Sequence, residues 1–440
     1  MTDSSAKCRR VVITGIGVIC PLGSHPEELW NGLSTGTSGV VTCDMLPVKS
    51  AGLSLKYAGE CRQFSGDIDN FGDLEKGKKK SIRKALKMMC RETQMAVAAA
   101  ELALFDAKVA DGSLDPERSG VVLGSDYMLT MPEDYIDSIN KCTEEGKFDY
   151  EDWGTDGLGQ MTPLWMLKYL PNMPASHIAI LNDLRGPNNS LTLREASSNM
   201  AVGEAFTTVA RGHADFMLAG ATGTRILPMQ AIHAMQTEQL ADADCDPAAA
   251  CRPFDKNRIG MVAGEGSGVV VLEELEHAQA RGAKIYGEVT GIGSSLVADR
   301  NLVGDTEKAM ANAITACLRD AELAPSDLGH LNAHGLATTE GDRKEAAAIG
   351  TALGDAGKNI PVTALKSYFG NLGAASGVVE LAGSLLAMQH GQLPAVLNYT
   401  EADPECDLTI ATSGAQPGSS FLNLSVTPQG QASVLAVVAS

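Results

Sequence analysis

Residues 10–19 read RVVITGIGVI, and residues 288–293 read EVTGIG, so both segments contain the tetrapeptide Thr-Gly-Ile-Gly. A β-branched run interrupted by glycines is typical of a buried strand that enters a tight turn. The match is short, but in each half of the chain a helical, alanine-rich segment and a second glycine-bounded apolar strand follow, at 120–124 and 330–335. The repetition predicts two related α/β halves, each with its own sheet and covering helices.

The composition is that of a large acidic globular protein. The 440 residues include 35 Lys and Arg against 54 Asp and Glu, which gives a net charge of −19, and 44% of the residues are hydrophobic. A chain of this length exceeds one compact core and is expected to form two or three packed units. The excess of acidic residues argues against nucleic acid or an anionic membrane as the main partner, because both favour Lys and Arg.

Ten cysteines are spread along the chain without a CxxC pair or a His/Cys cluster at metal-ligand spacing. This pattern favours small buried side chains over a zinc or iron–sulfur site, so we expect no metal and no cofactor. Residues 1–10 are polar and lead into the first strand without the apolar core of a signal peptide. No run approaches the roughly 18 apolar residues of a membrane span, so we expect a cytoplasmic protein.

Four segments have clear helical periodicity, with Ala, Leu, Met and Val at three- and four-residue spacing. They are 92–104, 201–211, 305–323 and 378–390. Residues 127–174 have weaker periodicity and predict an inserted, helical-to-irregular excursion. This insertion could pack on a partner subunit or form a surface lid, and the sequence leaves both possibilities open.

One acidic residue occupies a position where many enzymes carry a nucleophile. Residues 186–193 and 215–220 read as core strands, and the first leads through a short polar segment to a helix beginning near Asn199. Backbone N–H groups at a helix N-terminus point at whatever occupies such a turn. Here the occupant is Glu195, which could also be an ordinary helix-capping carboxylate.

Several ordered segments resemble the β-ketoacyl-acyl-carrier-protein synthases of the thiolase superfamily, most closely the type II elongating enzymes. The resemblance covers nearly the whole chain and rests on 10–23, on RPFD at 252–255, on GEGSG at 264–268 and on NAHG at 332–335. It implies a duplicated five-layer αβαβα sandwich with two pseudo-symmetric halves, 1–277 and 278–440. It also implies a dimer, which could be a homodimer or a heterodimer with an active ketosynthase.

The family uses a Cys–His–His triad, and the resemblance transfers it unevenly. Glu195 stands at the position of the nucleophilic Cys, His334 at the first histidine, and Asn371 at the second. Lys366 also matches the family pattern, and we expect it to form a buried ion pair with Asp342 or Glu345 that supports the site.

Near the C-terminus the family has a mobile loop of the form Asn-Ser-Phe-Gly-Phe-Gly-Gly, which gates the acyl pocket and lends a backbone N–H to the oxyanion hole. This chain keeps only the Asn of that motif, at Asn423. The gating-loop positions are Ser425, Val426, Thr427 and Pro428. Proline has no backbone N–H and stiffens a loop that the family needs to move.

The chemistry of these positions argues against condensation. A carboxylate is a far poorer acyl carrier than a thiolate, because a mixed anhydride hydrolyses readily. Decarboxylation of a malonyl thioester needs only donors around the developing enolate, and relatives with Gln at the nucleophile position can retain it. An ionised Glu195 would repel the malonyl carboxylate and the enolate, whereas a protonated Glu195 could imitate Gln.

A short basic stretch runs against the acidic composition. Between 75 and 91 the chain has eight Lys or Arg and a single acidic residue, Glu75. Acyl carrier proteins are strongly acidic, so this stretch is a candidate docking site, although it could also be a solvated helix face. The residues proposed for docking are Lys78, Lys79, Lys80, Arg83, Lys84 and Lys87.

Three functions remain open. The first is a non-condensing homologue that pairs with an active ketosynthase, similar to a chain-length factor, and the joint loss of nucleophile, second histidine and gating loop favours it. The second is a malonyl-carrier decarboxylase that supplies starter units, with His334 and Asn371 holding the enolate. The third is residual condensation through an unrecognised nucleophile, for which Ser197 and Ser198 are adjacent candidates. An acyl or malonyl thioester is the expected ligand in each case.

Overall fold

The computed structural model describes residues 9–44 and 55–440. Its α-helices are α1 Pro26–Thr35, α2 Lys76–Ala85, α3 Arg91–Asp106, α4 Ile136–Lys141, α5 Met173–Asn182, α6 Ser197–Ala210, α7 Pro228–Thr237, α8 Leu275–Ala280, α9 Thr306–Asp320, α10 Thr339–Leu353, α11 Lys366–Phe369 and α12 Ser376–His390. Its strands are β1 Val11–Ile19, β2 Val40–Thr42, β3 Tyr57–Gly59, β4 Ser119–Ser125, β5 Thr143–Glu144, β6 Lys147–Phe148, β7 Asn188–Thr192, β8 Phe216–Thr224, β9 Ala263–Glu274, β10 Gly287–Leu296, β11 His330–Asn332, β12 Val362–Thr363, β13 Ser420–Val426 and β14 Gln431–Val438.

The strand order confirms the duplication. The N-terminal half has the order β7-β4-β8-β9-β1, and the C-terminal half has the order β12-β11-β13-β14-β10. When the five strands of each set are renumbered 1 to 5 in chain order, both sets read 3-2-4-5-1. The hydrogen-bonding patterns also agree, because the first three strands of each order are parallel and the last two pairs are antiparallel.

The expectation of a separate sheet for each half is wrong. The first strands of the two halves, β1 and β10, pair antiparallel over Val11–Ile13 and Gly287–Val289. This short pairing joins the two sets, with β2 and β3 added beside β9, into one 12-stranded sheet. The expected boundary between 277 and 278 lies inside α8, and residues 281–286 then lead to β10.

The repeated glycines explain why the tetrapeptide recurs. A Cβ atom on Gly17 would lie 1.9 Å from the carbonyl oxygen of Ala99 in α3. A Cβ atom on Gly293 would lie 2.0 Å from the carbonyl oxygen of Ala313 in α9. Both distances are far inside van der Waals contact, so only glycine lets each outer helix approach its strand this closely.

A second feature of the repeat is an aspartate at the end of each outer helix. The backbone N–H of Ile16 donates to Asp106 Oδ2 at 2.8 Å, and the N–H of Ile292 donates to Asp320 Oδ2 at 2.9 Å. Asp106 ends α3 and Asp320 ends α9. The two halves therefore share local hydrogen bonds as well as strand order.

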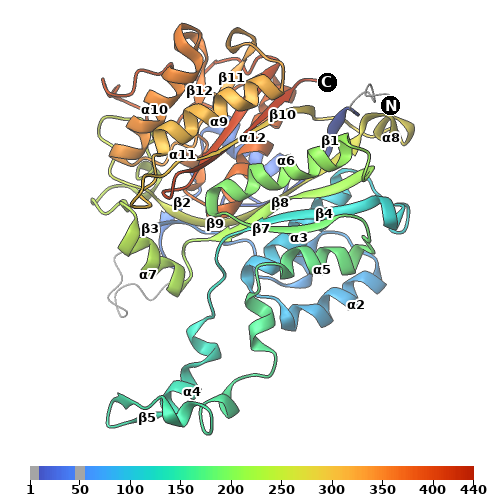
Figure 1. The fold of residues 1–440 in the computed structure, drawn as a ribbon, viewed down its shortest axis with the longest axis vertical. Coiled ribbons are helices and arrows are strands. Elements are labelled where there is room, and N and C mark those ends of the chain that lie inside the picture. The colour runs from blue at the N-terminus through green and yellow to red at the C-terminus, as the bar shows by residue number, and fades with distance from the viewer. Residues whose placement is uncertain (1–8, 45–54) are drawn as a thin grey trace.

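Five layers follow from this arrangement (Figure 1). Helices α3 and α5 cover the outer face of the N-terminal strands, while α9 and α10 cover the outer face of the C-terminal strands. Helices α6 and α12 lie between the two sets of strands and contact both. The four predicted helical segments are confirmed as α3, α6, α9 and α12. A mixed α/β fold of the thiolase-like class accounts for all of these layers.

The predicted excursion projects from the body as an arm (Figure 1). We use "the arm" for residues 127–172, which leave the body after β4 and return at α5. Six large apolar side chains of the arm are 45–76% exposed. They are Ile136, Phe148, Tyr150, Leu158, Leu164 and Met166.

The two edge strands of the sheet differ in how they are covered. In the C-terminal half the outer side of β12 is covered, because Val362 forms a parallel bridge with Ile410. In the N-terminal half β7 pairs with β4 on one side only, and Asn188, Asn189 and Thr192 are exposed. Among the described residues, therefore, one of two equivalent edges is open.

The remaining expectations concern cysteines, metals and membranes. Nine cysteines within 9–44 and 55–440 are free thiols, and Cys8 lies outside the described residues. No group of three or more potential metal ligands occurs in this described part of the chain. Likewise, none of its helices is both long enough and apolar enough to cross a membrane.

Candidate functional site

Glu195 enters the site from a tight turn between β7 and α6. A short 3-10 helix, Arg194–Ala196, leads directly into α6, and Arg194 has a positive φ of 51°. A non-glycine residue in this left-handed region is strained and is held there by its surroundings. The turn buries the Glu195 side chain, which is only 2% exposed.

The counter-ion of Glu195 is a residue that the sequence did not single out. Arg225 follows β8, and its Nη2 donates a hydrogen bond to Glu195 Oε1. Asn371 Nδ2 donates to the same oxygen at 3.2 Å, and Arg194 Nε lies 3.5 Å from Oε2. Glu195 and Asn371, which sequence reasoning placed at neighbouring triad positions, are thus in direct contact.

The surroundings of Glu195 favour its ionised form. Burial acts to raise the pKa of the carboxyl, but the charges of Arg225 and Arg194 act in the opposite direction and hold the pKa well below its usual value. Burial also acts to lower the pKa of the Arg225 guanidinium, yet its acidic neighbours raise that pKa above the ordinary value. An opposite charge within hydrogen-bond distance stabilises the charged form of both groups.

Arg225 also connects this pair to the base of the arm. Its Nη2 lies 3.1 Å from Asp126 Oδ2, and its Nη1 donates to the Tyr127 hydroxyl at 3.1 Å. The Tyr127 hydroxyl is in turn 2.6 Å from His233 Nδ1. The signal that could have revealed Arg225 is its place after a nine-residue strand that is buried throughout, because a charge there needs a buried partner.

His334 and Lys366 lie together behind the site, but Lys366 has a different ion-pair partner from the one expected. Lys366 Nζ donates to the His334 carbonyl at 2.8 Å and lies 3.3 Å from His334 Nδ1. Its ion pair is with Glu380 in α12, at 2.6 Å, and both side chains are at most 1% exposed. The predicted pairing with Asp342 or Glu345 is therefore wrong. Burial and the Lys366 charge lower the pKa of His334 well below its usual value, so its imidazole is neutral at pH 7.

Asp342 and Glu345 hold the backbone around His334. Glu345 accepts from the N–H groups of His334 and Gly335, at 2.6 and 2.8 Å. Asp342 accepts from the N–H of Ala337 at 3.0 Å. Burial raises the pKa of Glu345 to about 8 and that of Asp342 to about 6. These carboxyls support the loop that carries His334, which is a structural role.

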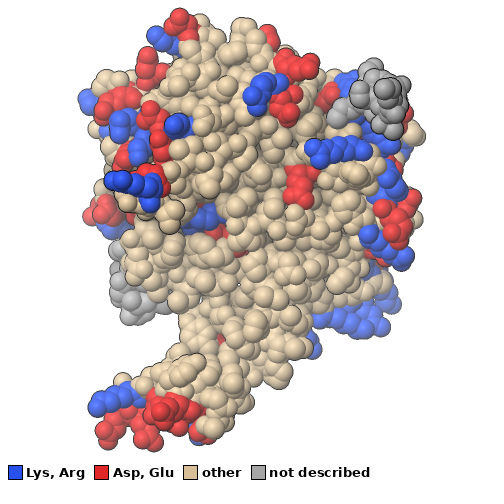
Figure 2. Space-filling view, viewed as in Figure 1, with Lys and Arg blue, Asp and Glu red and all other residues tan. Residues whose placement is uncertain are grey.

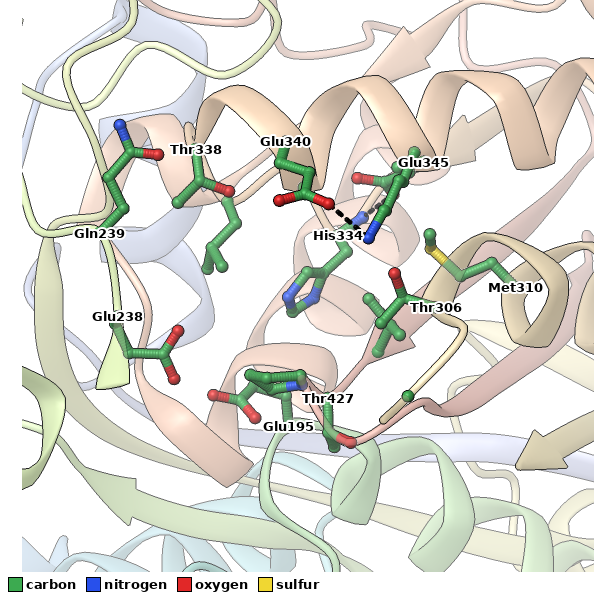
Figure 3. A pocket seen from close by; sticks show the side chains of 16 residues that line it. Glu195, Glu238, Gln239, Thr306, Met310, His334, Thr338, Glu340, Glu345 and Thr427 are labelled. Atoms are coloured by element: carbon green, nitrogen blue, oxygen red, sulfur yellow. Dashed lines mark hydrogen bonds and ion pairs between the residues drawn. The ribbon is translucent and has the colours of Figure 1, made fainter. Parts of the chain in front are cut away.

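A cavity of about 280 Å³ opens beside these groups (Figure 3). Glu195, Glu238 and His334 line it, and the close view shows the two carboxylates on one side with the imidazole ring near Glu195. Lys344 is the one Lys or Arg among the described residues of its wall, and it is paired with Glu340 at 2.6 Å. The wall therefore presents acceptors and no unpaired cation.

The gating-loop positions form a strand and a hairpin turn instead of a glycine-rich loop. Ser425 and Val426 belong to β13, opposite Ser433 and Ala432 of β14. The N–H of Thr427 then donates to the Gln431 carbonyl at 2.9 Å, which closes the turn that contains Pro428. Three of these four positions, Val426, Thr427 and Pro428, line the cavity. The apolar and polar residues that alternate along 422–426, all of them buried, together with the proline explain why a strand replaces a mobile loop here.

The basic stretch forms α2 and the turn that follows it. Lys76, Lys80, Arg83, Lys84 and Lys87 are exposed, and Figure 2 shows Lys and Arg gathered over the position of α2. Lys78 differs from them, because it is 9% exposed and paired with Glu101 at 2.6 Å. Arg91, at the start of α3, is paired with the buried Glu265. The exposed cations form the surface that we call the α2 patch.

Comparison with known proteins supports the architecture described above. Residues 8–278 match the model of the "Beta-ketoacyl synthase, N-terminal domain", and residues 286–400 match the "Beta-ketoacyl synthase, C-terminal domain". The chain is 33% identical over 403 residues to a 3-oxoacyl-[acyl-carrier-protein] synthase 2 of Synechocystis, covering 91% of this chain and 90% of that protein. It is 32% identical over 411 residues to the enzyme of the same name from Staphylococcus aureus, covering 93% and 92%.

Solved structures give the same result. A β-ketoacyl synthase from Burkholderia phymatum superposes with a TM-score of 0.83 at 29% identity, covering 98% of this chain and all of that one. The ishigamide ketosynthase/chain length factor gives 0.81 at 27%, covering 98% and 99%. A type II polyketide ketosynthase in complex with its acyl-carrier protein gives 0.82 at 26%, covering 99% and 100%. The chain therefore belongs to the β-ketoacyl synthase family.

Proposed function

We propose that this protein is a non-condensing β-ketoacyl synthase homologue that acts as the chain-length-factor-like partner of an active ketosynthase. The observation that carries the proposal is the buried ion pair between Glu195 and Arg225, at the position where the family resemblance expects a thiol. A carboxylate that is ionised and neutralised by a guanidinium is both a poor nucleophile and a poor acyl carrier.

The alternative nucleophiles are already occupied. Ser197 Oγ donates to the Ser125 carbonyl at 3.1 Å and accepts from the N–H of Leu193 at 2.8 Å. Ser198 Oγ donates to the Ala374 carbonyl. Each hydroxyl proton thus goes to a backbone oxygen and not to a base that could activate it. Condensation through either serine is disfavoured for this reason.

The decarboxylase alternative is disfavoured by charge. An ionised Glu195 repels the carboxylate of a malonyl group, and the amide N–H of Asn371 is directed at Glu195. His334 is neutral, and Lys366 is committed to Glu380. Two of the donors that would stabilise a developing enolate are therefore engaged elsewhere, and the ionised Glu195 near His334 opposes the negative charge of the enolate.

The surface supports the partner side of the proposal. The arm exposes apolar side chains, and the open edge of β7 lies beside it, because Ser190 Oγ donates to the Pro171 carbonyl at 3.0 Å. An exposed apolar surface next to an unpaired strand is typical of an interface. We propose that a ketosynthase occupies it, that the α2 patch receives an acyl carrier protein, and that the complex works in the cytoplasm, where free thiols persist.

The test uses malonyl-loaded acyl carrier protein and mass spectrometry. The purified chain alone is expected to release no carbon dioxide and to carry no acyl group. When it is co-expressed with a ketosynthase that has an intact Cys–His–His triad, the two chains are expected to co-purify and to elongate the acyl chain. Carbon dioxide release by the chain alone, abolished in the His334→Ala variant, would favour the decarboxylase instead.

A further inference from the structure

One oxygen of Glu195 has no hydrogen-bond donor. Oε1 accepts from Arg225 and Asn371, whereas Oε2 is buried and has no hydrogen-bond partner in the described part of the chain. Arg194 Nε lies 3.5 Å from this oxygen and is itself without a hydrogen-bond partner there. A buried charged acceptor that lacks a donor carries a desolvation penalty, which a ligand can relieve.

This oxygen belongs to a side chain that lines the cavity. Glu195 enters the cavity wall next to His334 and Glu238, as Figure 3 shows. The cavity of about 280 Å³ is near the lower end of the range for ligand pockets, roughly 300–1,000 Å³, so it fits a short ligand. An unsatisfied charged acceptor on a side chain that lines a small cavity is a candidate site for a hydrogen-bond donor.

The surrounding charges decide which ligands this site accepts. The cations close to Glu195 are neutralised, because Arg194 Nη2 donates to Glu238 at 2.7 Å and Arg225 contacts both Glu195 and Asp126. Lys344, on the wall, is paired with Glu340. A ligand carboxylate would therefore find no cation without an ion-pair partner on the described part of the wall and would lie close to the carboxylates of Glu195 and Glu238. It would have only neutral donors such as Gln239 and Thr306 to pair with, so its desolvation would be poorly compensated.

We propose that Glu195 determines specificity in this cavity, which binds a short, uncharged acyl thioester whose acyl chain carries a hydroxyl group that donates to Glu195 Oε2, and which excludes malonyl-type acids. The proposal rests on the function proposed above only in taking an acyl thioester as the ligand. A site that hydrogen-bonds a substrate hydroxyl discriminates strongly against the analogue without it, since the polar group of the protein is then left unpaired.

The experiment compares three pantetheine thioesters by isothermal titration calorimetry with the full chain. The probes are 3-hydroxybutyryl-, butyryl- and malonyl-pantetheine, which are similar in size but differ in donor and charge. The hydroxylated probe is expected to bind about 10- to 100-fold more tightly than the butyryl probe, as for one hydrogen bond to a charged group. The malonyl probe is expected to bind most weakly.

Two variants test whether Glu195 is the residue that determines the order in which the three probes bind. In Glu195→Gln/Arg225→Met, which removes both charges of the buried pair together, the preference for the hydroxyl should become smaller, because a neutral amide oxygen accepts a weaker hydrogen bond than a carboxylate, and the malonyl probe should bind better than in the unmodified chain. Thr306→Val, a change elsewhere in the cavity wall, should leave the order of the three probes unchanged.

Equal binding of the hydroxylated and butyryl probes would overturn the proposal, as would tightest binding of the malonyl probe or binding of none. These comparisons need only the unmodified chain, so they hold even if a variant fails to fold. They are also independent of the proposed function, because co-purification with a ketosynthase and carbon dioxide release do not depend on the order of the probes.

Discussion

Arg225 and Glu195 form an ion pair in the interior of the protein, with side-chain exposures of 0 and 2%. This is a buried ion pair, unlike a salt bridge on the surface, and it stands where the family resemblance places a catalytic thiol. Each charge is tolerated because the other is present, so the two residues must be considered as one unit in any substitution.

Removing one member of this pair should therefore cost far more than removing both. We expect Arg225→Met to lower the free energy of unfolding by about 3–5 kcal/mol, because it leaves Glu195 buried without its main counter-ion. The double variant Glu195→Gln/Arg225→Met should recover part of that loss, because Glu195 no longer carries a charge, although Asp126 still lacks its counter-ion. Urea denaturation measures both, and Arg185→Met, which breaks the exposed pair with Asp183, should change stability by about 0–1 kcal/mol. A double variant no more stable than Arg225→Met would show that the buried charge of Glu195 does not depend on Arg225 as its counter-ion.

The duplicated glycines should be equally intolerant of a methyl group. Gly17→Ala and Gly293→Ala each place a Cβ atom against a helix carbonyl oxygen, and each should destabilise the protein by at least about 1–3 kcal/mol. Gly77→Ala is the matched control, because Gly77 lies inside α2 with nothing within 4 Å of its added Cβ. That change should stabilise by about 0.5–1 kcal/mol. Tolerance of either strand substitution in a thermal unfolding experiment would show that the close packing is not needed.

His330 should make the protein sensitive to acid. Burial lowers its pKa to about 4, and its Nδ1 lies 2.7 Å from the Pro417 carbonyl. As the pH falls below about 6.5, the unfolded chain takes up a proton that the folded chain refuses until about pH 4, so stability is lost across this window. We expect His330 alone to account for about 2 kcal/mol between pH 7 and pH 5.

The measurement is a set of urea denaturation curves at several pH values for the unmodified chain and for His330→Gln. Gln can still donate to Pro417 but does not titrate. The difference between the two chains cancels the other ionisable groups, and it should shrink as the pH falls from 7 to 5. A difference that stays constant with pH would show that His330 does not titrate in this range.

The α2 patch should determine the affinity for an acyl carrier protein. Lys84→Glu/Lys87→Glu is expected to weaken binding of a loaded carrier at least tenfold at low salt, and the loss should become smaller as salt screens the charges. Lys108→Glu/Lys358→Glu makes the same change in net charge at exposed positions outside the patch and should have little effect. Surface plasmon resonance at two salt concentrations separates the cases, and equal losses in both double variants would point to net charge alone.

The arm should determine assembly with a ketosynthase partner. Tyr150→Ser/Met166→Ser removes two side chains that are 76 and 57% exposed, so it should leave the stability of the isolated chain unchanged. Binding to the partner should weaken at least tenfold in analytical ultracentrifugation, because exposed aromatic residues and Met are enriched at interfaces. Leu302→Ser, at a position 87% exposed on the body, is the control and should not affect assembly. Unchanged assembly of the arm variant would remove the arm from the interface.

Local patterns in the sequence predicted the duplication and the main helices, but not how the two halves join. The Thr-Gly-Ile-Gly repeat predicted the duplication because its glycines serve a short-range requirement, the approach of one helix to one strand. The four predicted helices were found for a similar reason, since their apolar spacing records which face is buried. The join between β1 and β10 was missed because the pairing of two strands 276 residues apart produces no local pattern in the sequence of either strand.

The site was predicted only as far as the resemblance reached. It led to Glu195, His334 and Asn371, but not to Arg225, whose role depends on a contact 30 residues away. Glu380, the true partner of Lys366, was overlooked although it is a lone acidic residue in the apolar segment 378–390. The hairpin at Thr427 was missed because the resemblance suggested a loop where the local alternation favours a strand.

The open edge of β7 has a consequence for handling the protein. Unpaired N–H and C=O groups along an edge strand can recruit any other strand, including the same edge of another copy. Among the described residues, this edge lacks the cover that Ile410 gives to Val362 in the other half. Mutual repulsion between chains of net charge −19 opposes such self-recruitment, and salt weakens that repulsion. Aggregation during purification should therefore increase with ionic strength and be suppressed when a natural partner is produced in the same cells.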